Sequence, residues 1–145
     1  MSCFVQKIVN FTQPEDGFIA ANIYGNTANR AILALHGITH NALFFDHFAK
    51  KAIEKCFCVI AIDLPGRGKS SYFKHSRNYN YKNYCDILKQ VTQKLEVKNP
   101  ILLGDSMGGL ISMMFLNENS NFIDKLILND IGYFIPSEVL NRVGY

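Results

Sequence analysis

A serine between glycines is the feature of this sequence most able to do chemistry. The segment Gly104-Asp105-Ser106-Met107-Gly108-Gly109 directly follows the apolar run Ile101-Leu102-Leu103. This order predicts a sharp turn from a strand into a helix, which strains the backbone of the serine and exposes its hydroxyl. Side chains in place of the flanking glycines would collide with the neighbouring strand or helix. The motif therefore predicts Ser106 as a nucleophile for acyl transfer, with the Met107 N–H at the helix start placed to stabilise an oxyanion.

A second segment, His36-Gly37-Ile38, follows the continuous apolar run at residues 30–35. Such a run is typical of a strand buried on both faces. We expect the small residue Gly37 to let the backbone turn, so that the Ile38 N–H faces the same point as that of Met107. The expected function of Ile38 is therefore that of a backbone donor. The His36 ring is expected to brace the loop through hydrogen bonds.

A third segment, Asp63-Leu64-Pro65-Gly66-Arg67-Gly68-Lys69-Ser70, superficially looks like a phosphate-binding loop. A P-loop needs a glycine at the position that Asp63 occupies, and Ser71 stands where a dinucleotide-binding pattern has its third glycine. Both phosphate-binding motifs are therefore excluded. We interpret the segment as a structural loop in which Asp63 accepts N–H groups from the turn and Pro65-Gly66 fixes the bend.

With these segments in this order, the chain resembles the α/β-hydrolase superfamily. Leu128-Asn129-Asp130-Ile131-Gly132 and Ile135-Pro136 are similar to the sixth-strand region of its esterase-like members. The resemblance implies an α/β-hydrolase fold, a mostly parallel sheet with flanking helices, with Ser106 as nucleophile and Ile38 with Met107 as oxyanion hole. It implies hydrolysis of an ester or related acyl bond in a small-molecule substrate through an acyl-enzyme, without a metal or organic cofactor.

A nucleophilic serine needs a base and an acid to activate it, and the sequence does not place them in the expected order. In the superfamily the order along the chain is serine, acid, histidine, whereas all four histidines here precede Ser106; they are His36, His40, His47 and His75. A rearranged triad that uses one of them is an alternative. Asp130 is the candidate acid because some members place it at this strand end, although a turn or capping aspartate is the simpler interpretation. Asp105 is assigned no role.

We expect a single partial domain at 1–145, truncated after about the sixth strand, with the entry to a cap region near 133–145. Alone, it is expected to have little or no activity, since the base is missing. The alternative is a non-catalytic remnant or an interaction subunit that pairs with another chain through an open sheet edge. In a version that combines the hydrolase and the interaction subunit, a separate C-terminal chain supplies the acid and the histidine.

The elements that must position these residues can be read from hydrophobic periodicity. Strands are predicted at 4–11, 18–24, 30–35, 57–62, just after Pro100, and at 123–129, with a hairpin turn at Glu15-Asp16-Gly17. Helices are predicted at 42–55, 81–95 and 107–117, and another begins near Pro136. The apolar face of the first helix is formed by Phe44, Phe45, Phe48, Ala49, Ala52 and Ile53. Alternation of strand and helix from residue 30 onward favours a parallel sheet covered by helices.

Composition sets the outer limits on function. The 145 residues are 48% hydrophobic and 19% charged, which is typical of a foldable globular domain. The net charge of +3 comes from scattered basic residues, so nucleic-acid binding is not expected. No apolar stretch has the length of a membrane span and no signal peptide is evident. The four cysteines show no framework spacing, and we therefore expect reduced thiols and a cytoplasmic protein.

Overall fold

The first two strands of the chain form an antiparallel pair at one edge of the sheet. In the computed structural model, which describes residues 4–131, β1 (Phe4–Phe11) pairs with β2 (Gly17–Tyr24) over its whole length. Gly17 already pairs with Phe11. The connection therefore comprises residues 12–16, and it is longer than the tight turn expected at Glu15-Asp16-Gly17.

The four remaining strands are parallel to one another. They are β3 (Arg30–Leu35), β4 (Phe57–Ile62), β5 (Ile101–Asp105) and β6 (Lys125–Asn129). The sheet order is β1-β2-β4-β3-β5-β6, with β2 antiparallel to β4 and the other central pairs parallel. β3 lies in the middle and is buried from Ala31 to Leu35, as expected for a strand covered on both faces. The six-stranded, mostly parallel sheet confirms the predicted fold class.

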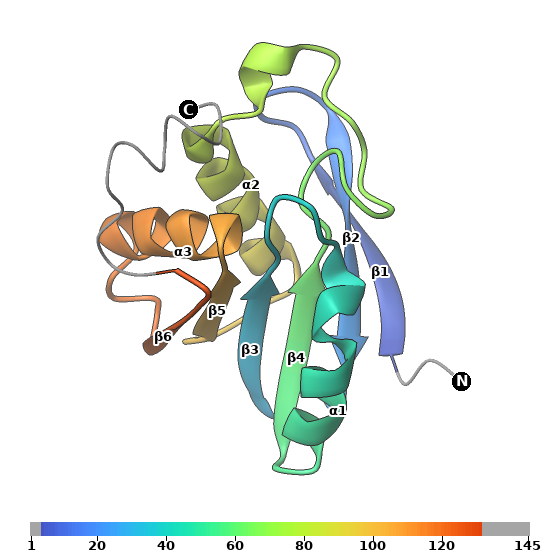
Figure 1. Ribbon diagram of the computed structural model, residues 1–145, viewed down its shortest axis with the longest axis vertical. Coiled ribbons are helices and arrows are strands. Elements are labelled where there is room, and N and C mark those ends of the chain that lie inside the picture. Colours follow the sequence, from blue (N-terminus) through green and yellow to red (C-terminus); the bar gives the residue numbers. More distant parts are fainter. Residues whose placement is uncertain (1–3, 132–145) are drawn as a thin grey trace.

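Helices cover both faces of this sheet (Figure 1). α1 (Asp46–Ile53) packs on one face, and α2 (Tyr81–Lys94) with α3 (Met107–Glu118) packs on the other. The side chains of β3 alternate between the two cores, since Leu33 and Leu35 face α2 and α3 whereas Ile32 and Ala34 face α1. The period of two along the strand thus connects two separate hydrophobic layers.

The segment at 42–55 differs from the single helix expected there. It begins as a 3₁₀ turn, η1 (Ala42–Phe45), capped by the Asn41 side chain, and continues as α1 only to Ile53. The buried row is Phe45, Ala49 and Ala52, whereas Phe44 is 44% and Phe48 39% exposed, so the expected apolar face was wrong for these two. The helix is rotated so that its smaller residues meet β4 and β2, and the Phe44 ring stacks on His40 instead of entering the core.

β6 is an edge strand of the described sheet. Within residues 4–131 it pairs with β5 on one side only, and Ile127 on it is 44% exposed. It begins at Lys125, two residues later than expected. The helix expected from Pro136 and the cap entry expected at 133–145 lie outside the described residues.

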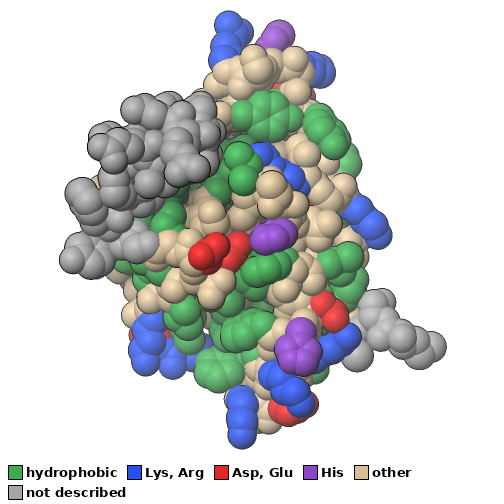
Figure 2. Space-filling view, viewed as in Figure 1, with side chains coloured by type: hydrophobic (Ala, Val, Ile, Leu, Met, Phe, Trp, Pro, Cys, Tyr) green, Lys and Arg blue, Asp and Glu red, His purple; other side chains and the backbone are tan. Residues whose placement is uncertain are grey.

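The surface shows no concentration of positive charge on the face of Figure 2. Lys and Arg side chains are spread around it rather than gathered in one patch, consistent with the scattered basic residues of the sequence. Within residues 4–131, none of the helices combines the length and the apolar character that crossing a membrane requires.

Candidate active site

Ser106 lies at the junction between β5 and α3, in a backbone conformation that few residues adopt. Its φ is 49° and its ψ is −114°, a strained combination for a residue with a side chain. Such a conformation costs about 1–3 kcal/mol and persists only where the surroundings enforce it. Here the Ser106 N–H donates to the Asn129 carbonyl at 3.0 Å, and the Ser106 carbonyl accepts from the Gly109 N–H at 2.8 Å.

Two glycines allow this turn to form. A Cβ on Gly104 would lie 2.5 Å from both the Gly108 carbonyl oxygen and the Gly109 Cα. A Cβ on Gly108 would fall on the backbone carbonyl of Leu35. The first turn of α3 therefore lies directly against the ends of β3 and β5, at a distance that only glycine permits.

The start of α3 presents backbone donors beside the serine. The first N–H groups that find an acceptor across the helix start are those of Gly109 and Leu110, which both reach the Ser106 carbonyl. The N–H groups of Met107 and Gly108 precede them and have no acceptor within the helix. They also lie at the positive end of the helix dipole. This end of α3 can therefore stabilise an oxygen that gains negative charge.

The loop after β3 approaches the serine from the other side. The position that a Cβ on Gly37 would take is 3.4 Å from the Ser106 Cβ, so the loop backbone is in close contact with the serine turn. Ile38, the next residue, is exposed. Its carbonyl accepts from Arg67 Nε at 3.4 Å, and Arg67 also donates to the Tyr84 hydroxyl at 3.0 Å. Arg67 thus ties this loop to α2.

The buried His36 ring makes the bracing hydrogen bonds expected of it. Its Nε2 accepts from the Leu64 N–H at 3.0 Å, and its Nδ1 lies 2.7 Å from the Gly37 carbonyl. An acceptor role at Nε2 leaves the proton on Nδ1, which donates to that carbonyl, so the ring is neutral. Burial lowers the pKa of His36 below its usual range. Both ring nitrogens of His36 are therefore used in hydrogen bonds that hold the loops.

Asp63 organises the loop after β4, also as expected. Its Oδ1 accepts from the Ala42 N–H at 2.6 Å and its Oδ2 accepts from the Lys69 N–H at 2.9 Å. Gly68 has a φ of 54°, and a Cβ there would fall on the Asp63 carboxylate. The loop is therefore closed around this side chain, whose two oxygens already accept backbone N–H groups.

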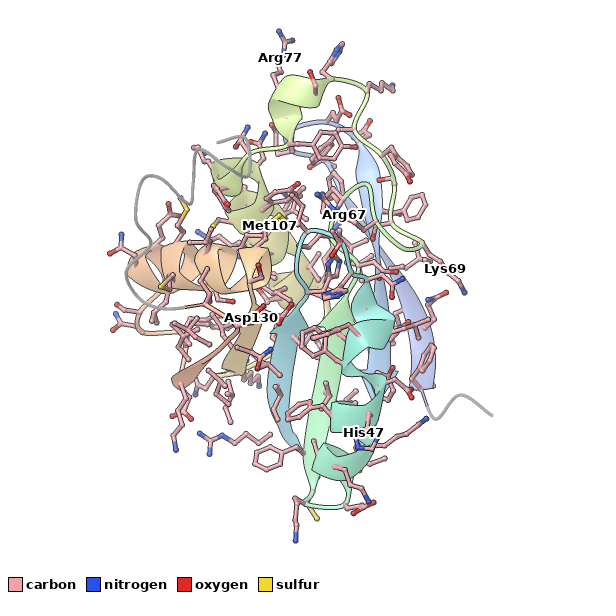
Figure 3. All side chains as sticks on the ribbon, in the orientation of Figure 1. His47, Arg67, Lys69, Arg77, Met107 and Asp130 are labelled. Carbon is pink, nitrogen blue, oxygen red and sulfur yellow. The ribbon has the colours of Figure 1, made fainter. Side chains whose placement is uncertain are left out.

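The other expected site residues lie on separate elements (Figure 3). Asp130 follows β6 with a φ of 53°, is exposed, and lies over the same end of the sheet as Met107. His47 lies on α1, far from that end, and His75 precedes the 3₁₀ turn η2 (Ser76–Asn78).

One contact joins a histidine to a carboxylate beside the serine, and sequence reasoning missed it. His40 Nδ1 lies 3.4 Å from Asp105 Oδ2, although the two residues are far apart in the chain. Asp105 also accepts from Asn129 Nδ2 at 2.7 Å. The only available signal was that Asp105 directly precedes Ser106, which does not reveal its partners.

In the part of the chain that the structure describes, a metal-ligand cluster is absent and the cavity described below lies away from Ser106. Within residues 4–131, no three His, Cys, Asp or Glu side chains gather closely enough to hold a metal ion. A cavity of about 830 Å³ is lined by Arg30, Gln93 and Lys98 among others. Arg30 begins β3 whereas the serine follows the end of β5, so this cavity lies at the opposite end of the parallel strands from Ser106.

The strained serine turn, its two glycines and the loop after β3 occur here together at one end of a mostly parallel sheet. The sequence model of the alpha/beta hydrolase fold family matches residues 30–143. The chain belongs to the α/β-hydrolase family. It is 30% identical to the serine hydrolase-like protein of Mus musculus and 31% identical to that of Homo sapiens, in each case over 75% of this chain. These alignments cover 35% and 53% of the two relatives.

A solved structure supports the same family. An α/β hydrolase from Novosphingobium aromaticivorans is 25% identical, and it superimposes with a TM-score of 0.85 over 99% of this chain and 50% of its own. This α/β-hydrolase chain therefore spans about half, or less, of the length of the relatives it matches.

The close approach of α3 to β3 can be tested with a pair of glycine variants. Gly108→Ala should lower the free energy of unfolding by about 2 kcal/mol or more, because its Cβ meets the backbone of Leu35. Gly109→Ala should cost less, because its Cβ meets the Ile131 Cγ2 methyl at 2.5 Å and the nearest backbone atom, the Gly104 carbonyl oxygen, only at 3.4 Å. Urea denaturation of both variants measures the difference. Equal costs would contradict the described packing.

Buried, neutral His36 predicts a pH dependence of stability. Its lowered pKa means that near pH 6 the folded state binds fewer protons than the unfolded chain. The free energy of unfolding should therefore fall as the pH drops below about 6.5, by at most about 1.4 kcal/mol per pH unit. Urea denaturation at about pH 7.5 and about pH 5.5 measures this loss. His36→Gln should reduce it and exposed His47→Gln should not; an unchanged dependence in His36→Gln would refute the assignment.

Proposed function

We propose that this α/β-hydrolase chain is the nucleophile-bearing part of a serine hydrolase that cleaves an ester or related acyl bond in a small molecule. The observation that carries the proposal is the strained Ser106 between β5 and α3, beside N–H groups that have no acceptor within the helix. The serine hydrolase-like proteins among its relatives support the same reaction class.

In this mechanism the Ser106 Oγ attacks the acyl carbon and the carbonyl oxygen becomes an oxyanion. The N–H groups of Met107 and Ile38 donate to that oxygen, and each such donor typically contributes about a hundredfold or more in rate. The hydroxyl proton passes to a base, which then gives it to the leaving alcohol as the acyl–oxygen bond breaks. Water hydrolyses the resulting acyl-enzyme by the same route, and the serine is restored.

The base in this proposal comes from outside the 145 residues. His36 uses both ring nitrogens in structural hydrogen bonds, His40 Nδ1 faces the Asp105 carboxylate at 3.4 Å, and His47 and His75 lie on other elements. Asp130 is proposed as the acid that orients the incoming histidine, because it follows β6 at the end of the sheet that carries Met107. The 145 residues thus form one partial domain with little activity of their own, and a C-terminal segment or chain supplies the base.

The compartment proposed for this protein is the cytoplasm. Cys56, Cys58 and Cys85 are free thiols in the structure. Burial raises the pKa of the Cys58 and Cys85 thiols, so that they behave as small hydrophobic side chains. Free thiols of this kind fit a reducing environment.

The proposed function predicts how a fluorophosphonate probe reacts with the chain. Labelling should be slow and confined to Ser106, and roughly tens of millimolar imidazole should accelerate it about tenfold or more by acting as the missing base. Ser106→Ala should abolish labelling, whereas exposed Ser120→Ala should not change it. Intact mass after timed incubation measures the rate. Fast labelling without imidazole would contradict the missing base, and no labelling with imidazole would contradict the nucleophile.

A second candidate function is an interaction subunit. The observation that favours it is β6, which has a strand partner on one side only within the described sheet and carries the exposed Ile127. Unpaired strand edges recruit strands from other chains. In this version another chain adds a strand to β6, whether or not Ser106 reacts.

Strand addition at β6 predicts a stable complex in the native cell. The tagged chain should co-purify with a partner, and Ile127→Lys should lose it. Val5→Lys is the matched control, because Val5 is exposed on β1 at the opposite edge of the sheet. Co-purification followed by intact mass measures the stoichiometry. Recovery of the wild-type chain as a lone monomer would contradict this function.

A further inference from the structure

The loop at residues 37–41 and the serine turn meet at a single carboxylate. Asp105 Oδ2 lies 3.4 Å from His40 Nδ1 and 2.8 Å from the position that a Cβ on Gly37 would take. The same Cβ position is 3.4 Å from both His40 Nδ1 and the Ser106 Cβ. Gly37 is therefore surrounded by the carboxylate, the imidazole and the serine, and these groups belong to two segments far apart in the chain.

The Asp105 carboxylate is held rigidly while His40 lies at the surface. The Asp105 side chain is only 4% exposed, and its other oxygen accepts from Asn129 Nδ2 at 2.7 Å. The adjacent Ser106 N–H donates to the Asn129 carbonyl, so β6 fixes both residues of the turn. The His40 side chain is 44% exposed. Its ring is stacked on Phe44, with centroids 4.3 Å apart and planes 12° apart, which sets the direction of Nδ1.

We propose that His40 and Asp105 are positioning residues, whose charge contact holds the loop that carries the Ile38 N–H against the turn that carries Ser106. This inference rests on the proposed function, in which Ile38 and Ser106 are oxyanion donor and nucleophile. The 3.4 Å between His40 Nδ1 and Asp105 Oδ2 is within ion-pair range when the imidazole is protonated. In this proposal a cation at position 40 that reaches Asp105 is the required property, and His40 acts on Ser106 through the loop rather than as its base.

Amide hydrogen exchange of Ile38, measured by NMR without substrate, tests the contact directly. His40→Gln and Asp105→Asn should each speed the exchange about fivefold, the scale expected for a partly exposed ion pair. The double variant should exchange no faster than either single variant, because both remove the same contact. His40→Lys, which keeps a cation, should restore most of the protection. His47→Gln, at an exposed position in the first turn of α1, should change nothing.

Two outcomes would overturn the proposal. One is an unchanged Ile38 exchange rate in His40→Gln, and the other is a failure of His40→Lys to restore protection. The His40 pair of variants keeps the test valid even where Asp105→Asn does not fold. Repeating the exchange in a Ser106→Ala background separates the loop contact from catalysis, since protection there is independent of any reaction of the serine.

A second readout distinguishes positioning from base catalysis. In the presence of imidazole, fluorophosphonate labelling of Ser106 should slow severalfold in His40→Gln and recover in His40→Lys, because the loop is restored. A base at position 40 would instead give fast labelling of the wild type without imidazole, which both variants would lose with unchanged Ile38 exchange. That pattern would overturn the positioning role and leave the nucleophile assignment intact.

Discussion

The close approach of α3 to the ends of β3 and β5 is the constraint on which the rest of this structure depends. Gly104 and Gly108 let two backbones touch, and the chain between them must then turn within a single residue. Ser106 takes the strained conformation because neighbours on both sides are fixed. The energy stored in this residue, about 1–3 kcal/mol, is supplied by burial of α3 and β5 in the core. The packing that forms the core therefore also forces Ser106 into its strained conformation.

A layer of buried polar groups supports that approach from the loops. His36 joins the end of β3 to Leu64, and Asp63 joins the end of β4 to η1 and to Lys69. Ser70 completes the layer by accepting from the Ala20 N–H and donating to the Asp63 carbonyl. Buried polar groups are tolerated where each finds a partner. These hydrogen bonds therefore fix the loops that follow β3 and β4 to one another.

Residues with a local reason for their identity were predictable from the sequence. The glycines of the serine turn and Asp63 in the loop after β4 stand in local motifs, although Gly108 also meets Leu35 and Asp63 also accepts from the Ala42 N–H. The strands β3 and β4 were placed correctly because their apolar runs are uninterrupted, and β1 was placed correctly although polar residues interrupt its run. The rotation of α1 was not predictable, because it depends on which of its residues fit against β4 and β2. The contact of His40 with Asp105 likewise joins distant segments and leaves no local pattern.

The hydrogen bond from the Ser106 N–H to the Asn129 carbonyl places the strained turn against the outermost described strand. Asn129 also holds Asp105 through its side chain, so a single residue at the end of β6 supports two successive residues of the turn. The position of the serine turn therefore depends directly on the edge strand β6. A strand that paired with β6 would cover the edge and would also hold Asn129, and with it the serine turn, more firmly. Fraying of β6 would loosen the turn without any change to the serine itself.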